Sequence, residues 1–144
     1  MENFNLERLG VAASVLGITK CLYEETRKYS VERQAFGHSL RDHQVIRHKI
    51  VDMSISIQAM ETMLDNAIWR AQQGGYSAAE TAILKPFVGI EHEKCASNAV
   101  QIHRGAGVLR GNKVEEIFRE SKILSIGGGS TEVIKDLVAK QTGI

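Results

Sequence analysis

A glycine-rich segment near the end of the 144-residue chain carries the residue types most able to do chemistry. Residues 127–129 are all glycine, and Ser130, Thr131 and Glu132 follow directly. The segment is compatible with a phosphate-binding loop, with a turn between helices, or with a catalytic loop that has lost its catalytic side chain. The phosphate-binding P-loop pattern requires a lysine before its Ser/Thr, and this segment has none, which disfavours the first of these.

Other segments with reactive side chains lack the spacing that their chemistry requires. In GAGVLRG, residues 105–111, Arg110 stands where the dinucleotide-binding pattern GxGxxG has its last glycine, and a helix-like segment precedes it rather than a strand. The histidines show neither HxxxH nor Glu-x-x-His spacing, so we expect no metal site and expect each histidine at the surface or hydrogen-bonded in the core. We expect Cys21 and Cys95 to be buried thiols in a reducing compartment.

The elements that must position these residues are predicted to be helices, because the chain has one proline and few alternating β-branched runs. The clearest helix has apolar residues at alternating steps of four and three, the pattern of a bundle helix. These residues are Ile46, Ile50, Met53, Ile57, Met60, Leu64 and Ala67. The pattern predicts an all-α protein, a bundle of four to six helices.

Glycine, proline and hydroxyl residues set the bounds that we expect for the other helices. The first is predicted over 6–28, with Leu9, Ala13 and Leu16 on its buried face, and a loop follows it. Pro86 is expected to kink or break the third helix, which ends near Arg104. A shorter helix is predicted over 113–123, and Ser130 or Thr131 is expected to cap a last helix that runs to about residue 141.

Composition places the chain among ordinary globular domains. Hydrophobic residues make up 43% and charged residues 24% of the sequence, and the length suits one domain. A net charge of +1 gives no electrostatic reason to expect nucleic acid or an anionic membrane as a partner. No apolar run approaches the roughly 20 residues of a membrane span, so we expect none.

Four segments, taken in order, resemble the C-terminal helical domain of the acyl-CoA dehydrogenases. They are LERLGVAASVLG, YSVERQAFGHSLRDHQVIRHKIVDM, QIHRGAGVLRGNKVEEIFRESKI and IGGGSTEVIKDLVAK. Each segment alone is a weak match, but all four follow one another at plausible spacings. The resemblance implies that residues 1–144 form this one domain, an up-down four-helix bundle with a short extra C-terminal helix. The family's N-terminal helical domain and middle β-domain are expected to lie outside it.

The resemblance also implies a reaction, a cofactor and partners. In this family a glutamate removes the α-proton of an acyl-CoA thioester while the β-hydrogen leaves as hydride to the flavin of FAD. Hydrogen bonds to the thioester carbonyl stabilise the charge that develops there. The expected partners are an acyl-CoA substrate, an electron-transferring flavoprotein and further copies of the chain in a dimer or tetramer. The expected location is the bacterial cytoplasm or, as the alternative, the mitochondrial matrix.

The position of the catalytic base departs from the commonest pattern of the family. Most members have the base at the position of Gly128, and a glycine cannot remove a proton. Members of the isovaleryl and long-chain type carry it on the first bundle helix, in a segment similar to NLERL, which places Glu7 in the matching position. We therefore predict Glu7 as the base. The alternative is an ordinary first-turn glutamate favoured by the helix dipole.

The resemblance assigns the remaining site residues to FAD and to the substrate. Arg33 is expected to meet the pyrophosphate of a neighbouring subunit's FAD. Arg104 replaces the first glycine of the family's Q-x-x-G-G turn, where its cation either pairs with a phosphate or blocks the site. Arg8 matches an arginine near the CoA pocket, and the N–H of Gly128 is expected to donate to the thioester carbonyl. The expected FAD-binding residues are Arg33, Phe36, Gln44, Gln101, Arg104, Gly105, Ser130, Thr131 and Glu132.

Two other functions fit the same resemblance. One is a flavin oxidase or monooxygenase on the same fold, which differs in its electron acceptor. The other is a non-catalytic helical oligomerisation module. Because the β-domain makes most contacts with the flavin ring, we expect the isolated chain to form oligomers and to bind FAD weakly or not at all.

Overall fold

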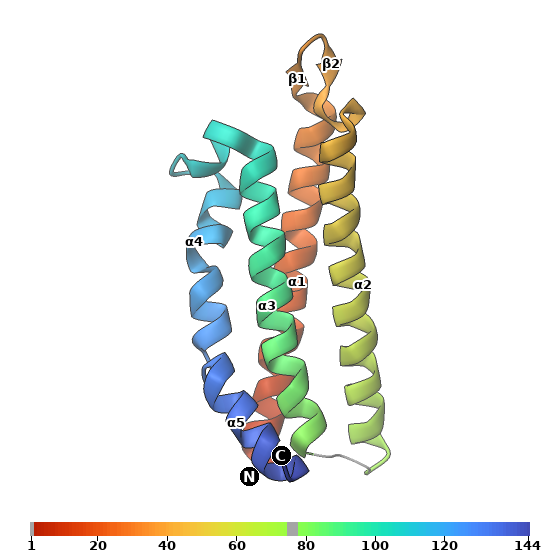
Figure 1. Cartoon of the computed structure of the whole chain (residues 1–144), viewed down its shortest axis with the longest axis vertical. Coiled ribbons are helices and arrows are strands. Elements are labelled where there is room, and N and C mark those ends of the chain that lie inside the picture. Colours follow the sequence, from red (N-terminus) through yellow and green to blue (C-terminus); the bar gives the residue numbers. More distant parts are fainter. Residues whose placement is uncertain (1, 75–77) are drawn as a thin grey trace.

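The computed structural model is an antiparallel bundle of long helices (Figure 1). It describes the backbone of residues 2–74 and 78–144, and their side chains except for residues 2–6, 78, 80 and 81. Successive long helices run in opposite directions, and a short last helix follows the fourth. The elements are α1 (Glu2–Glu32), β1 (Gln34–Ala35), β2 (His38–Ser39), η1 (Leu40–Asp42), α2 (Gln44–Gln72), α3 (Ala78–His103), η2 (Arg104–Val108), α4 (Lys113–Ile126) and α5 (Thr131–Thr142). The predicted bundle with an extra C-terminal helix is confirmed.

Helix α3 is the central element of the bundle, because it contacts each of the other four α-helices. Its buried side chains include Leu84, Val88 and Ile102, each at most 1% exposed. Pro86 lies inside α3, and the helix continues through it, so of the two predicted effects the break is wrong and the kink stays a prediction. Since each of these buried side chains contributes about 1.5–3 kcal/mol, the contacts of α3 supply much of the stability.

The predicted buried face of α2 is largely confirmed, and that of α1 is partly wrong. Met53, Met60, Leu64 and Ala67 of α2 are buried, and Ile46, Ile50 and Ile57 are half-buried. On α1, Leu9 and Leu16 are buried as expected, but Ala13 is exposed, and Ala12 and Val15 are buried in its place. The buried residues of α1 therefore follow steps of three and four, from Leu9 through Ala12 to Leu16.

The predicted loop after α1 is a two-stranded hairpin at the tip of the bundle (Figure 1). Gln34 pairs with Ser39 and Ala35 with His38. The two residues between the strands both have positive φ, 54° at Phe36 and 81° at Gly37, as a type I′ turn requires. This turn leaves the Phe36 side chain 86% exposed.

The glycine-rich segment lies at the other end of the bundle, between α4 and α5. Helix α4 continues to Ile126, three residues beyond the predicted end. The Ser130 side chain accepts a hydrogen bond from the N–H of Val133, so Ser130 is the N-cap of α5. No described helix is both long enough and apolar enough to cross a membrane.

Candidate functional site

The structure divides the predicted site residues between the two ends of the bundle. Glu7, Arg8, Gly128 and residues 130–132 lie at one end, and Arg33, Phe36, Gln44, Gln101, Arg104 and Gly105 lie at the other. Helix α3 connects the ends. On α3, residue 85 lies beside the glycine turn and residue 101 lies beside the hairpin. The two positions are 16 residues apart, which is about 24 Å along the helix at 1.5 Å per residue.

At the first end, the glycine turn lies against α1. Gly128 has a φ of 73°, and a Cβ atom built on it would lie 3.9 Å from Cγ2 of Val11. Val11 is four residues after Glu7, so the two side chains share one face of α1, one helical turn apart. Glu7 is exposed. The structure therefore brings the predicted base and the glycine at the family's usual base position to neighbouring places.

Charged side chains from three helices meet around this turn. Lys85 of α3 is buried and donates hydrogen bonds to the backbone carbonyls of Ser125 and Gly129. Burial and then the cation of Arg8 lower the pKa of Lys85, while the carboxylate of Glu132 acts in the opposite direction. Arg8 on α1 and Glu132 on α5 are thus both close enough to Lys85 to affect its pKa.

The hydroxyl residues and the glutamate after the turn take part in the start of α5. Ser130 caps the helix, and Thr131 is its first residue and half-buried. The backbone N–H of Glu132 and then the Ser130 hydroxyl hold the pKa of the exposed Glu132 below its ordinary value. An ionised carboxylate at a helix N-terminus is the arrangement that the helix dipole favours.

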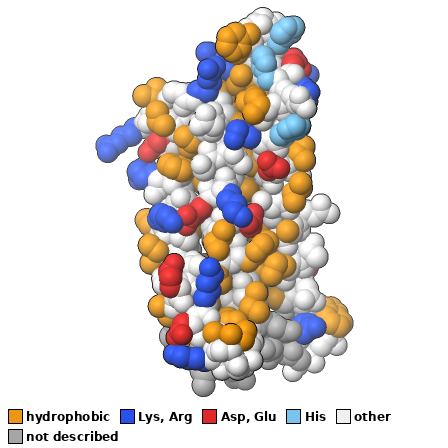
Figure 2. Space-filling model, in the orientation of Figure 1, with side chains coloured by type: hydrophobic (Ala, Val, Ile, Leu, Met, Phe, Trp, Pro, Cys, Tyr) orange, Lys and Arg blue, Asp and Glu red, His pale blue; other side chains and the backbone are white. Residues whose placement is uncertain are grey.

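At the second end, an open pocket of about 280 Å³ collects several of the residues expected to bind FAD. We call it the tip pocket. Phe36, Gln101 and Arg104 line it, together with Ala35, Leu40, His43, Val45, Ile46 and Lys49. Arg33 lies at the foot of the hairpin, where its carbonyl accepts a hydrogen bond from the N–H of Leu40. Figure 2 shows that histidine and basic side chains gather on the surface at this end.

Arg104 has an unusual backbone for its residue type. Its φ is 56°, in the left-handed region that favours glycine and costs other residues about 1–2 kcal/mol. Arg104 stands where the resemblance expects a glycine, and its own backbone adopts the conformation that glycine favours. The side chain is exposed at the mouth of the tip pocket. An exposed cation, an amide from Gln101 and an exposed aromatic ring from Phe36 together suit a phosphate and a flat ring system.

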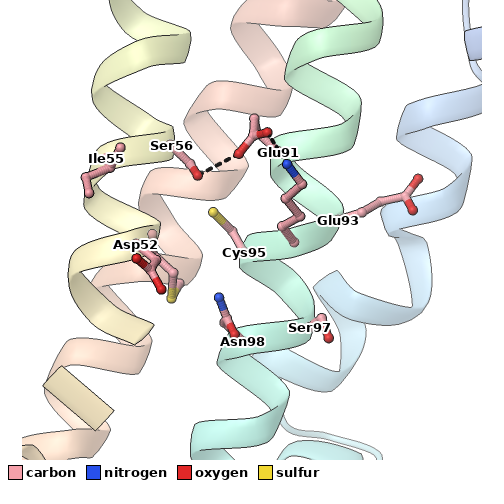
Figure 3. A pocket seen from close by; sticks show the side chains of 10 residues that line it. Asp52, Ile55, Ser56, Glu91, Glu93, Cys95, Ser97 and Asn98 are labelled. Atoms are coloured by element: carbon pink, nitrogen blue, oxygen red, sulfur yellow. Dashed lines mark hydrogen bonds and ion pairs between the residues drawn. The ribbon is translucent and has the colours of Figure 1, made fainter. Parts of the chain in front are cut away.

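A larger pocket lies elsewhere and contains none of the predicted site residues. It is an open groove of about 660 Å³ between α2 and α3 (Figure 3). Glu91 accepts hydrogen bonds from Ser56 at 2.7 Å and from Lys94 at 2.6 Å. Burial works to raise the pKa of Glu91, but these hydrogen bonds hold it below its ordinary value. Burial raises the pKa of Cys95 to about 11, so its thiol is largely protonated and unreactive near neutral pH.

The two buried histidines are hydrogen-bonded in the core, as predicted. Nδ1 of His92 lies 2.7 Å from Oγ1 of Thr19, whose hydroxyl donates to the carbonyl of Val15. The Nδ1–H of His92 therefore donates to Oγ1 of Thr19. Nδ1 of His103 donates to the carbonyl of Ala99. Burial lowers the pKa of both rings. In the part of the chain that the structure describes, no group of three or more His, Cys, Asp or Glu side chains could hold a metal ion.

Three residues of these sites were not predicted from the sequence. His43 and Lys49 line the tip pocket from the start of α2. Lys85 holds the glycine turn, and the signal for it was a lone lysine within the apolar run AILKPFVGI. A charged residue in such a run is almost never fully buried without a partner, so it should have prompted a search for one.

Comparisons with known proteins give one consistent family. Residues 1–143 match the family model described as acyl-CoA dehydrogenase, C-terminal domain. A 3-(aryl)acrylate reductase of Clostridium sporogenes is 28% identical over 96% of this chain and 37% of its own length. A probable acyl-CoA dehydrogenase of Bacillus subtilis is 29% identical over 93% of this chain and 35% of its own length. The chain thus spans about a third of the length of these curated relatives.

The solved structure of a butyryl-CoA dehydrogenase from Megasphaera elsdenii has the same arrangement of elements. It superposes with a TM-score of 0.95, is 29% identical, and covers 100% of this chain and 38% of its own chain.

Proposed function

The chain belongs to the family of acyl-CoA dehydrogenase C-terminal domains, and from this membership we propose that it is the helical C-terminal part of an FAD-dependent acyl-CoA dehydrogenase. The reaction is α,β-dehydrogenation of an acyl-CoA thioester, with Glu7 as the base. FAD, when bound, supplies the hydride acceptor. The partners in this proposal are an electron-transferring flavoprotein and further copies of the chain, and the location is the bacterial cytoplasm.

One observation carries the assignment of the base. Gly128 packs on Val11, and Glu7 is one turn away on the same face of α1. A carboxylate on α1 therefore reaches the space beside Gly128 that the family's usual glutamate would occupy. Only the position of the carboxylate matters for removing the α-proton, so its helix of origin is immaterial.

Gly128 itself retains a role that needs no side chain. It is exposed, and its N–H is not used by the hydrogen bonds that close the turn, which come from the N–H groups of Gly127 and Gly129. Such an N–H can donate to the thioester carbonyl, where negative charge develops as the α-proton leaves. Arg8, the residue after Glu7, places a positive charge beside the substrate pocket in this proposal.

The donor set of the tip pocket fits the role proposed for it. Gln101 and Arg104 provide an amide and a cation for the phosphates, and Phe36 provides a ring for stacking. Arg33 and Gln44 do not line the pocket, but they are exposed at the same end of the bundle and add a cation and an amide there. Gly105 has open space where a side chain would be, so a ligand can approach its backbone. Since the tip pocket and the glycine turn are about 24 Å apart along α3, we propose that they serve the FAD groups of different subunits. At the glycine turn, residues 130–132 face the cofactor of their own subunit.

Anaerobic mixing of the full-length protein with acyl-CoA substrates tests this function. Bleaching of the flavin absorbance by saturated acyl-CoA, and recovery on adding an electron-transferring flavoprotein, is the expected result. A flavin that is reduced only by nitroalkanes, or reoxidised at once by oxygen during turnover, would favour the oxidase. A flavin that no acyl-CoA reduces would contradict the proposal.

A further inference from the structure

A buried lysine holds both sides of the glycine turn. Lys85 is 2% exposed, and its ammonium group donates to the carbonyl of Ser125, in the last turn of α4, and to the carbonyl of Gly129, at the end of the turn. Ser125 is among the last four residues of α4, whose carbonyls have no partner within the helix. A cation placed there also suits the negative end of the helix dipole.

Neighbouring contacts on the same face of α3 show that this position is built into the fold. Residues 85, 89 and 93 follow one another at steps of four and so share a face. A Cβ atom on Gly89 would lie 3.3 Å from Cβ of Ser125, so the two helices approach closely there. Glu93 accepts a hydrogen bond of 2.6 Å from Lys122 of α4. The end of α4 is therefore fixed on α3, and Lys85 extends this contact to the glycine turn.

The two carbonyls lie on either side of Gly128, three residues before it and one residue after it. Residues 127–129 have no side chains of their own to restrict their backbone, and glycine is the residue with the greatest conformational freedom. The turn makes two further backbone hydrogen bonds, from Gly127 to Ile123 and from Gly129 to Ile126. Without Lys85, little else would set the direction of the N–H of Gly128.

We propose that Lys85 is a positioning residue for the dehydrogenation. It fixes the glycine turn so that the N–H of Gly128 points at the thioester carbonyl, beside the carboxylate of Glu7. This rests on the proposed function. Burying a lysine is costly, and an apolar side chain would suit the run AILKPFVGI better for stability alone. What the lysine adds is a fixed position for the carbonyls of Ser125 and Gly129, on either side of the Gly128 N–H that is proposed to meet the substrate.

Hydrogen exchange at individual amides tests whether Lys85 fixes the backbone of the glycine turn. Two variants are compared with the wild type: Lys85→Met keeps the length of the side chain, and Lys85→Arg keeps its charge. Lys94→Met is the matched control, because Lys94 is an exposed lysine of α3 whose ion pair with Glu91 lies away from the turn. In Lys85→Met, we expect the amides of Gly127 and Gly129 to exchange about tenfold to a hundredfold faster, with α2 unchanged. Lys85→Arg restores part of the protection, and Lys94→Met leaves the turn as it was.

Steady-state kinetics of the full-length protein test the catalytic part. Lys85→Met is expected to lower kcat about tenfold or more with KM within about twofold, and Lys85→Arg to recover part of kcat. Unchanged exchange at the turn, equally faster exchange throughout the chain, or an unchanged kcat would each overturn the proposal. If no acyl-CoA reduces the flavin of the wild-type protein, both the proposed function and the catalytic role of Lys85 are overturned. Hydrogen exchange at the amides of the turn still decides in that case whether Lys85 holds the turn.

Discussion

Replacing Gly107 by alanine is expected to destabilise the turn that forms one wall of the tip pocket. A Cβ atom on Gly107 would lie 2.9 Å from Cβ of His103, 2.9 Å from the carbonyl oxygen of Val100 and 3.1 Å from Cα of Val100. Two of these three neighbours are backbone atoms, which cannot turn aside as the end of a flexible side chain can. The alanine therefore forces η2, which begins at Arg104, away from the end of α3, which carries Gln101.

The size of the effect follows from this crowding. Overpacking a close contact costs about 1–3 kcal/mol, and replacing a glycine returns about 0.5 kcal/mol through the unfolded chain. The net loss is about 0.5–2.5 kcal/mol, which lowers the Tm of a chain of this length by roughly 2–10 °C. Thermal unfolding followed by circular dichroism measures the change in Tm, and urea unfolding measures the free energy directly.

Gly105→Ala is the matched control in the same turn. A Cβ atom on Gly105 would have no neighbour within 4 Å, so the Tm should stay within about 2 °C of the wild type. In the full-length protein, however, the added methyl group lies where we expect FAD to approach, and FAD binding should weaken. Equal Tm changes for the two variants, or a Gly107→Ala protein that melts with the wild type, would refute the packing argument.

Three further predictions concern the other features of the molecule. Because burial lowers the pKa of His92 and His103, the unfolded chain binds protons at a higher pH than the folded chain. Stability should therefore fall as the pH falls below the ordinary histidine pKa of 6.5, and urea titrations that give equal stability at pH 7.5 and 5.5 would contradict this. Ser130→Ala should cost about 1 kcal/mol by removing the N-cap of α5, and Ser54→Ala on the exposed face of α2 should cost nothing measurable by the same titration. Arg104→Gly should relieve about 1 kcal/mol of backbone strain but weaken FAD binding to the full-length protein about tenfold; tighter binding would show that Arg104 blocks the pocket.

Local patterns in the sequence were sufficient to predict the helices. The alternating steps from Ile46 to Ala67 reflect one face of α2, and Ser130 at the start of α5 follows a capping rule that needs only neighbouring residues. The hairpin was missed because phenylalanine is disfavoured at positive φ, so Phe36 and Gly37 did not match the usual type I′ residues.

Contacts between distant parts of the chain could not be predicted in the same way. Lys85 reaches carbonyls 40 and 44 residues away, and His92 meets Thr19 across 73 residues. No local spacing encodes such pairs, because they arise only when α3 packs against α1 and α4. The resemblance to a known family supplied the expected site residues but not Lys85, which matched none of the motifs on which that resemblance rests.

Substitution of Glu7 tests the central claim most directly, because the account assigns proton removal to this one carboxylate. The measurement is the rate of flavin reduction by acyl-CoA in the full-length protein carrying Glu7→Gln, with Glu32→Gln as the control, since Glu32 is exposed at the opposite end of α1. We predict that Glu7→Gln slows flavin reduction by about 10²- to 10⁴-fold, with FAD still bound, and that Glu32→Gln does not slow it. A Glu7→Gln protein that reduces its flavin at a near-normal rate would contradict the account.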